Sequence, residues 1–337
     1  MGTVIPLKKE INNSYLELKN LVSDKLDSVN WVIKSKLESK INLIQKMTNH
    51  HLSISGKRIR PLLTLATSRL CGYENGKRDI NLAACVELIH SATLLHDDVI
   101  DKSDLRRGIK TANSIWGNQS SILIGDYFFS RCFEMMVEDG SSEILKLLSS
   151  TSSIIAQGEV LQLEHKGEVD LLEETYFNII NMKTAALFSA ATRVGACISN
   201  KTEKEKNALE SYGKNIGLAF QIADDALDYH STQKIFGKKI GKDFFEGKAT
   251  LPLIIIFQRA NKEEKSFLKE IFKKEKRNED DFSETLALIN KYKAVQESFK
   301  KAEYFVNISY GALGIFENST EKKVLQNLTG FSLNRSF

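Results

Sequence analysis

The chain has 337 residues, of which 42% are hydrophobic and 27% are charged, a composition typical of soluble globular proteins. Its 47 basic and 43 acidic residues leave a formal net charge of +4, which is too balanced to indicate a nucleic-acid-binding protein. We expect no membrane span and no signal peptide, because no run of about 18 apolar residues is present. The four cysteines form no C-x-x-C pair, which argues against a zinc site and a disulfide framework and favours a reducing, cytoplasmic location.

The distribution of prolines and apolar residues favours an all-α fold. Only Pro6, Pro61 and Pro252 occur, so long stretches are free of the residue that breaks helices. Apolar residues recur at helical spacing between short polar turns. We expect one domain over residues 1–337, with about residues 1–30 as an N-terminal helical extension. Turns are predicted at 72–79, 101–111, 138–143 and 165–170, with a longer loop at 236–250 and a charge-rich surface turn at 273–284.

The segment LLHDDVID (94–101) ends an apolar stretch with three carboxylates. Asp97 and Asp101 are four residues apart and therefore share one helix face, and Asp98 stands beside them. A solvated helix end is the simplest interpretation of this motif taken alone. The preceding His96 is interpreted as a packing residue or as an indirect support for the site.

A second segment, FQIADDALDY (220–229), repeats the D-D-x-x-D spacing after another apolar run, with Asp224, Asp225 and Asp228. Two copies are improbable as decoration of helix ends, and six carboxylates need cations to be tolerated. Hard divalent ions take oxygen ligands, and Mg²⁺ usually keeps several waters and bridges to substrate phosphates. The two motifs therefore predict a Mg²⁺ site, and the lack of nearby cysteine ligands argues against zinc.

Basic residues recur close to both motifs. They are Lys57, Arg58 and Arg60 in GKRIRP, Arg106 and Arg107 in LRRG, Lys183 in NMKTAALF, and Lys238, Lys242 and Lys248 after the second motif. Guanidinium groups bind phosphate oxygens in pairs, and lysines act as mobile charges. Each residue alone fits a surface cation, but with the carboxylates they indicate a diphosphate substrate. Apolar helix faces below the site indicate that the rest of the substrate is hydrophobic. No glycine motif of a nucleotide-binding fold is present.

Six segments occur in the order typical of the trans-polyprenyl diphosphate synthases, a family that the chain resembles from about Lys57 to Pro252. They are GKRIRP, ELIHSATLLHDDVIDKSDLRRG, GEVLQL, MKTAALF, FQIADDALD and GKKIGKDFFEGKATLP. The resemblance implies the all-α isoprenoid synthase fold, with helices around a deep central cavity. It also implies that an allylic diphosphate ionises with the help of up to three Mg²⁺ ions. Isopentenyl diphosphate then attacks, and proton loss gives a product one isoprene longer. A homodimer and a peripheral membrane contact for product release are further expectations.

The resemblance also implies roles for individual residues. The metal ligands would be Asp97, Asp98, Asp101, Asp224, Asp225 and Asp228, which with Arg106 and Lys183 would carry the catalytic step. The allylic diphosphate would contact Arg106, Lys183, Thr184, Gln221, Lys238 and Lys248. Isopentenyl diphosphate would contact Lys57, Arg60, His90 and Arg107, and Gln162 would line the reaction centre. Without the resemblance, His90 fits a core histidine and Thr184 a helix-surface hydroxyl.

Two small residues before the first motif bear on the length of the product. Thr93 and Ala92 lie four and five positions before Asp97, about one helical turn or roughly 5.4 Å along the axis. Short-chain members of the family often carry aromatic residues there, so small residues would leave a tunnel open. The segment ILIGDYFFSRCFEMM (122–136) resembles octaprenyl and decaprenyl enzymes. Its candidates for the tunnel floor are Phe128, Phe129, Phe133, Met135 and Met136, and plain core packing suits most of them better. We expect a long-chain product of about eight to ten isoprene units for quinone side chains. Short- or medium-chain synthases, class I terpene cyclases and non-catalytic synthase subunits are the alternatives.

Overall fold

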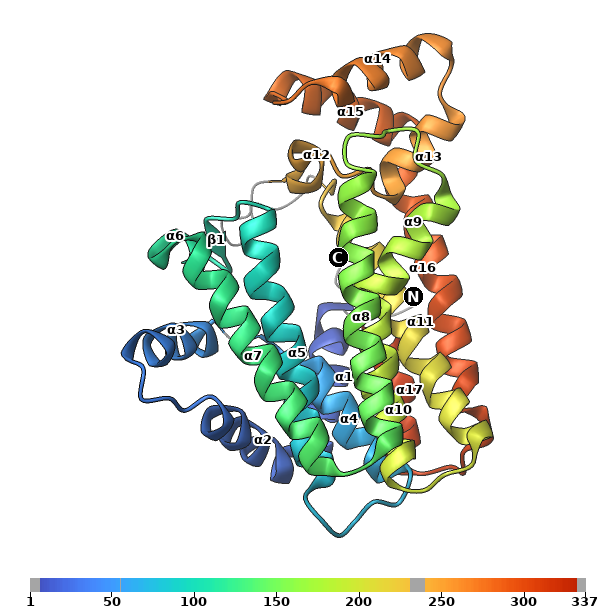
Figure 1. The fold of residues 1–337 in the computed structure, drawn as a ribbon. Coiled ribbons are helices and arrows are strands. Elements are labelled where there is room, and N and C mark those ends of the chain that lie inside the picture. The colour runs from blue at the N-terminus through green and yellow to red at the C-terminus, as the bar shows by residue number, and fades with distance from the viewer. Residues whose placement is uncertain (1–6, 55, 231–239, 332–337) are drawn as a thin grey trace.

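The structure is a computed structural model that describes residues 7–54, 56–230 and 240–331. Helices account for nearly all of its regular structure, so the predicted all-α fold is confirmed (Figure 1). The first part of the chain forms α1 (Leu7–Leu21), α2 (Ser23–Lys36), α3 (Asn42–Ser53), α4 (Ile59–Leu70), α5 (Arg78–Ile100), α6 (Ala112–Trp116), α7 (Asn118–Asp139) and α8 (Ser142–Glu164). Next come α9 (Glu173–Ile180), the π-helix η1 (Asn181–Ala185), α10 (Ala186–Ile198), α11 (Glu203–Leu227) and α12 (Lys242–Glu246). The last part forms α13 (Leu251–Arg259), α14 (Lys262–Lys273), α15 (Glu279–Lys291), α16 (Ala294–Ala312), the 3₁₀ turn η2 (Leu313–Ile315) and α17 (Thr320–Thr329).

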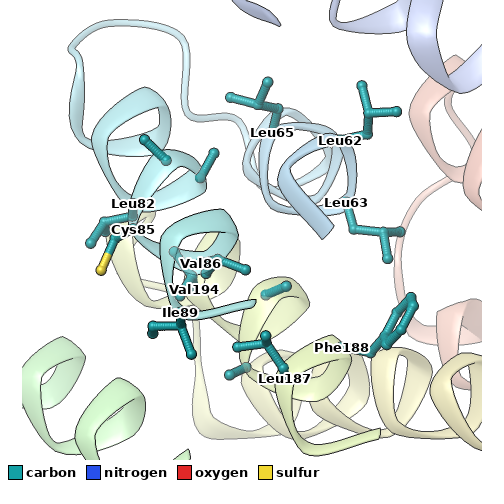
Figure 2. Packing of buried hydrophobic residues seen from close by; sticks show 14 of the residues in the cluster. Leu62, Leu63, Leu65, Leu82, Cys85, Val86, Ile89, Leu187, Phe188 and Val194 are labelled. Carbon is teal, nitrogen blue, oxygen red and sulfur yellow. The ribbon is translucent and has the colours of Figure 1, made fainter. Parts of the chain in front are cut away.

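Helix α5 runs through the interior, with α2, α4, α7 and α10 packed around it. Residues 82–89 of α5 are buried without exception, as expected of a helix that is apolar on all sides. Figure 2 shows these residues gathered with leucines of α4 and with Leu187, Phe188 and Val194 of α10. Burying one such side chain contributes about 1.5–3 kcal/mol. This packing fixes the helix whose C-terminal end carries the first carboxylate motif.

Helix α11 belongs to both apolar clusters of the described chain. Its residues Leu209, Tyr212 and Ile216 belong to the cluster that also contains residues of α4, α5 and α10, whereas Leu218, Ala219, Ile222 and Ala226 belong to the cluster with α9, α13 and α16. Glycines allow the close approach, because a Cβ on Gly217 would lie 2.6 Å from the Cα of Ala185. The second carboxylate motif, at the end of α11, is thereby held directly against η1.

Two predicted loops contain regular structure that the sequence analysis did not anticipate. The loop at 236–250 includes the short helix α12, which begins and ends at the left-handed residues Gly241 and Gly247. The charge-rich segment at 273–284 includes the start of α15, where Asn278 and Asp281 form a reciprocal capping box. High charge in that segment stabilises a helix N-terminus, where acidic side chains are favourable.

The turn at 101–111 contains the only strands of the described residues, β1 (Leu105–Arg106) and β2 (Ile109–Lys110). They pair antiparallel, so that Arg106 stands opposite Ile109.

Among the described residues, no helix combines the length and the hydrophobicity needed to cross a membrane. All four cysteines are buried and unpaired by disulfides.

Candidate active site

The two carboxylate motifs lie at the C-terminal ends of α5 and α11, with Asp101 and Asp228 as the C-cap residues. Acidic side chains are unfavourable at this end of a helix, because the helix dipole is negative there. Helix stability therefore does not explain why the motifs lie at these positions.

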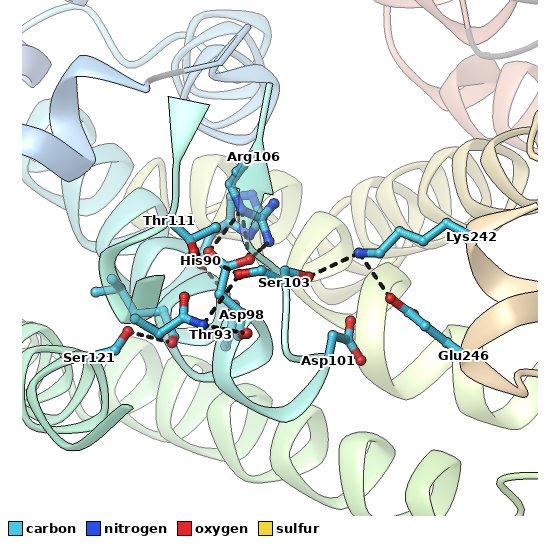
Figure 3. Close-up of polar contacts among 12 residues, drawn as sticks. His90, Thr93, Asp98, Asp101, Ser103, Arg106, Thr111, Ser121, Lys242 and Glu246 are labelled. Atoms are coloured by element: carbon cyan, nitrogen blue, oxygen red, sulfur yellow. Dashed lines mark hydrogen bonds and ion pairs between the residues drawn. The ribbon is translucent and has the colours of Figure 1, made fainter. Parts of the chain in front are cut away.

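The middle aspartate of each motif is turned inward and held by protein donors. Asp98 is 5% exposed and accepts from the Arg106 guanidinium, with Nη2 2.8 Å from Oδ1 (Figure 3). Asp225 is 4% exposed and accepts from the Tyr176 hydroxyl and the Gln221 amide, each at 2.7 Å. Both side chains therefore have their oxygens engaged before any ligand binds.

The outer aspartates of the first motif, Asp97 and Asp101, interact with lysines. Burial raises the pKa of Asp97 to about 7, with Lys183 opposing the shift and Glu159 and Asp101 adding to it. Burial also favours a raised pKa at Asp101, but Lys248 and other lysines outweigh it and hold that pKa below its usual value. The Lys248 ammonium lies 2.9 Å from both Asp101 oxygens, although 147 residues separate the two in sequence. This ion pair joins the end of α5 to the segment that follows α12.

Asp243 is an acidic residue that the sequence analysis passed over. Its backbone N–H donates to the Asp228 carboxylate at 2.8 Å, and it lines the same pocket as Asp225. Burial, with Asp225 and Asp228 nearby, raises the pKa of Asp243 well above its usual value. Burial is the main cause of the raised pKa values at Asp97, Asp225 and Asp243, and neighbouring carboxylates add to it, so a bound cation would favour the ionised forms.

The carboxylates fit a hard divalent cation by their chemistry, since they offer oxygen donors alone. No group of three or more His, Cys, Asp or Glu side chains in residues 7–54, 56–230 and 240–331 is arranged to hold a metal ion as it stands. The middle aspartates are bound to protein donors, and Asp101 is bound to Lys248.

Lys183 and Thr184 project from η1, a π-helix of the kind that often marks functional sites. The Lys183 ammonium donates to Glu159 at 2.6 Å and to Gln162 at 3.0 Å, and Thr184 donates to Gln221 at 2.8 Å. With Lys248 and Asp225, these side chains line a pocket of about 90 Å³. Glu159 is a second acidic residue that the sequence analysis missed.

Lys242 also reaches the first motif, where it links Ser103 at 3.1 Å to Glu246 (Figure 3). A larger hollow of about 500 Å³ lies between α8, α10 and α11. It contains none of the motif carboxylates, and Arg193 there pairs with Glu210 at 2.5 Å. The chemistry therefore belongs to the smaller pocket.

A second basic cluster lies beside the first motif. The Arg60 guanidinium stands 4.4 Å from the Phe188 ring centre, its buried Nε has no hydrogen-bond partner, and burial lowers its pKa to about 10. Burial and nearby arginines lower the pKa of His90 well below its usual value, so its imidazole is neutral. Glu87 pairs with this cluster, 3.7 Å from Arg58. An anion would satisfy these groups.

Arg107 and Lys57 complete this cluster. Arg107 has a left-handed backbone (φ 53°), and its guanidinium lies so close to Gly56 that a Cβ there would clash at 2.1 Å. Arg58 is left-handed as well (φ 49°), and such strain in non-glycine residues is typical of functional sites. The Lys57 ammonium lies 4.6 Å from the ring centre of Phe331, near the C-terminal end of the described chain.

The sequence profile of the polyprenyl synthetase family matches residues 41–289, which is well over half of the chain. The chain belongs to this family. It is therefore a prenyltransferase, and its relatives place it with the long-chain polyprenyl diphosphate synthases.

Three relatives illustrate the likeness. The octaprenyl diphosphate synthase of Haemophilus influenzae is 34% identical over 331 residues, which cover 98% of this chain and 100% of that protein. The crystal structure of a decaprenyl diphosphate synthase from Rhodobacter capsulatus has a TM-score of 0.91 and 38% identity, covering 96% of this chain and 99% of that one. A polyprenyl synthase from Caulobacter crescentus, complexed with calcium and isoprenyl diphosphate, has a TM-score of 0.91 and 39% identity, with coverage of 96% and 98%.

The remaining predicted residues of this synthase fall in different places. Lys238 lies outside the described residues. Ala92 is fully buried in the core around α5, and the part-buried Thr93 donates to the His90 carbonyl at 2.8 Å. His96 lies against α7, with Nε2 3.1 Å from the Ile122 carbonyl oxygen, consistent with a packing role. Phe133 is 47% exposed, so it faces outward rather than into the core.

Proposed function

We propose that the enzyme condenses isopentenyl diphosphate head-to-tail with an allylic diphosphate, such as farnesyl diphosphate, in a Mg²⁺-dependent reaction. The observation that carries this proposal is the presence of two separate anion sites. One is the pocket lined by Asp225, Asp243, Lys183 and Lys248, which the Lys248–Asp101 ion pair joins to the first carboxylate motif. The other is the basic cluster of Arg60, His90 and Arg107, which has almost no carboxylate of its own.

Within the first site, Asp97, Asp101, Asp224 and Asp228 are the proposed metal-binding residues. They are the first and last members of each motif, and on a helix such i, i+4 pairs share a face. Asp98 and Asp225, expected to be ligands as well, are almost fully buried, and we propose that they orient Arg106 and Gln221 instead. When bound, Mg²⁺ supplies Lewis-acid stabilisation to the negative charge that develops on the departing diphosphate.

The lysines and Arg106 are proposed to contact the allylic diphosphate. A lysine ammonium has three N–H donors, and Lys183 uses two of them on Glu159 and Gln162. Its third donor is therefore available to the ligand in a fixed direction. Positive charge held where the leaving group forms stabilises the transition state more than the ground state.

The basic cluster is proposed to bind isopentenyl diphosphate without a metal ion. Arginines grip phosphate oxygens bidentately, and a neutral His90 can donate one hydrogen bond without adding charge. Placing the second diphosphate on side chains alone keeps the two substrates in distinct electrostatic environments. This separation fits a reaction in which one diphosphate leaves and the other stays.

Incubation of the purified enzyme with farnesyl diphosphate, labelled isopentenyl diphosphate and Mg²⁺, followed by chromatography, tests this function. Chain-elongated diphosphates of C40–C50 are the expected products. Cyclised hydrocarbons would instead indicate a terpene cyclase. Absence of any product at all Mg²⁺ concentrations would indicate a non-catalytic subunit and contradict the proposal.

We further propose that small side chains at Ala92 and Thr93 permit this long product, which would supply the side chain of ubiquinone or menaquinone. A product of C20 or shorter from the unmodified enzyme would contradict this part of the proposal alone. Thr93→Tyr should shorten the product markedly, whereas an unchanged product length would show that the tunnel runs elsewhere. Because the hydrocarbon is insoluble in water, we propose that it is delivered at a membrane surface.

We also propose that the enzyme is a homodimer that pairs through α7 and α8, which run side by side along one face (Figure 1). Leu123 and Val137 on α7 and Val160 and Leu163 on α8 are each more than half exposed. Large apolar side chains exposed on two successive helices are the kind of surface that an interaction would cover. A second copy would cover it with the same two helices.

A further inference from the structure

We propose that Tyr176 is a positioning residue of this synthase, which fixes the direction of a hydrogen-bonded row that ends at Thr184. The row runs from Tyr176 through Asp225 and Gln221 to Thr184. This inference rests on the proposed function, because the row borders the pocket assigned to the allylic diphosphate. Tyr176 itself is not placed in contact with substrate.

The row consists of three short hydrogen bonds between three elements. Tyr176 on α9 is 3% exposed, and its hydroxyl donates to Asp225 Oδ2 at 2.7 Å. Gln221, one turn before Asp225 on α11, donates through Nε2 to Asp225 Oδ1 at 2.7 Å. The Gln221 Oε1 then accepts from the Thr184 hydroxyl of η1 at 2.8 Å.

The chemistry of the groups gives the row one direction. An ionised carboxylate only accepts hydrogen bonds, so both of its neighbours must be donors. Gln221 must therefore turn its NH₂ group toward Asp225 and its carbonyl oxygen toward Thr184. Because the Thr184 proton is used in this bond, only the lone pairs of that hydroxyl remain for the pocket.

This polarity changes what Thr184 is able to bind. Phosphate oxygens are acceptors, and Thr184 has no proton left to give them. It can instead accept from an ordered water or face a positive centre in the pocket. Its predicted contact with the allylic diphosphate would then be made through a bridging donor.

Tyr176 matters because Asp225 is buried and has two oxygens to satisfy. Gln221 holds one oxygen, and the other would have no donor from this row if the phenol were removed. A carboxylate with no hydrogen-bond donor on one oxygen can rotate about its Cβ–Cγ bond. The amide of Gln221 then loses its fixed hydrogen-bond partner. Unsatisfied buried polar groups are costly, so the site would rearrange.

Tyr176→Phe tests the proposal, because it removes only the hydroxyl. Tyr212→Phe is the matched control, since Tyr212 is also fully buried and donates one 2.7 Å bond, to the Leu325 carbonyl away from the site. At pH 8, Tyr176→Phe should lower kcat about tenfold, with KM for both substrates within twofold. Tyr212→Phe should leave kcat within twofold while costing a similar drop in Tm.

A double-mutant cycle separates positioning from general damage. Thr184→Val removes the end of the row, and adding Tyr176→Phe to it should lower kcat no further. Gln221→Met interrupts the row in the middle, and the same non-additivity is expected in that background. The proposal would be overturned if the reductions in kcat multiplied in either cycle, or if the Tyr176→Phe enzyme had a normal kcat. An unmodified enzyme that fails to elongate any substrate would refute the proposed function instead.

Discussion

Asp97 and Asp224 occupy equivalent places, each as the first carboxylate of a motif near the C-terminal end of a long helix. Neither makes a hydrogen bond that holds the fold together in the way that Asp98 and Asp225 do. Both also stand against the negative end of a helix dipole, which costs about 0.3–1 kcal/mol at such positions. Their presence serves ligand binding at the expense of stability.

Asp97→Ala or Asp224→Ala should therefore lower turnover at least 100-fold while leaving Tm equal or slightly higher. Product formation and thermal unfolding of the same preparations check the two halves of this prediction. Near-normal turnover in either variant would contradict the proposal that the substituted aspartate binds metal.

His51 is a buried histidine whose pKa falls to about 3, through burial and then through Arg106 and Arg58. In the unfolded chain its pKa is about 6.5. Between pH 6.5 and 3 the unfolded chain binds a proton that the folded chain does not. The free energy of unfolding therefore falls as the pH falls, by up to about 2 kcal/mol at pH 5 from this residue.

His51→Phe should reduce this acid sensitivity, because an aromatic ring keeps the edge contact with Phe128 but binds no proton. Urea unfolding at pH 7 and pH 5 measures the difference, with His165→Phe as a surface control. An equal loss of stability in His51→Phe and the parent would show that the acid sensitivity arises elsewhere.

Among the elements, the π-helix η1 has the greatest influence on the site. Helix α8 packs against it with no room to spare, because a Cβ on Gly158 would lie 2.8 Å from both the Lys183 backbone nitrogen and the Met182 Cβ. Gly158 precedes Glu159, which holds the Lys183 ammonium. Spacing between α8 and η1 thus sets the position of Lys183.

Gly158→Ala should displace α8, cost about 1–3 kcal/mol through overpacking, and lower kcat about tenfold or more. Gly311→Ala is the control, because a Cβ there meets nothing within 4 Å. The control should keep full activity and gain up to about 1 kcal/mol from the higher helix propensity of alanine. Full activity in Gly158→Ala would mean that η1 tolerates a shift of α8.

Periodicity explains which elements could be predicted from the sequence. Helix α5 and the D-D-x-x-D motifs follow from spacings of three and four residues, which are direct signatures of an α-helix. The π-helix leaves no such signature, since one wider turn depends on packing against Gly158. Asp243, Glu159 and Tyr176 were not predictable as site residues, because each is a lone polar residue whose partner is distant in sequence. The capping box that Asn278 and Asp281 form at the start of α15 could have been predicted from its spacing, but that segment was predicted to be a turn.

At the scale of the whole molecule, the site combines residues that lie far apart in the sequence. Lys248 meets Asp101, and Lys242 meets Ser103, across 147 and 139 residues. No local pattern predicts these pairs, whereas burial of α5 and α11 in shared cores makes them inevitable once the fold forms. The family resemblance supplied an expected role for Lys248 but none for Lys242, and packing supplies the reason that these residues meet.

The proposed dimer yields a test at this scale. Val160→Asp places a charge on a side chain that is 65% exposed, so the monomer fold should tolerate it. Buried in a dimer interface, the same charge would cost several kcal/mol. Sedimentation should show a shift from dimer to monomer. Tyr304→Asp, at a 63% exposed apolar position on α16, should leave the mass unchanged. A dimeric Val160→Asp enzyme would place the interface on another face.

The burial of every cysteine has a practical consequence for following this enzyme in motion. Burial raises the pKa of Cys71 and of Cys197 to about 12, and that of Cys132 well above its usual value. A thiol reagent reacts with the thiolate, so the native thiols should remain unmodified at neutral pH. One cysteine introduced on an exposed helix would then carry a fluorophore or spin label alone. With one such cysteine on α8 and a second on α12, the distance between these helices would become measurable during turnover without removing any native cysteine.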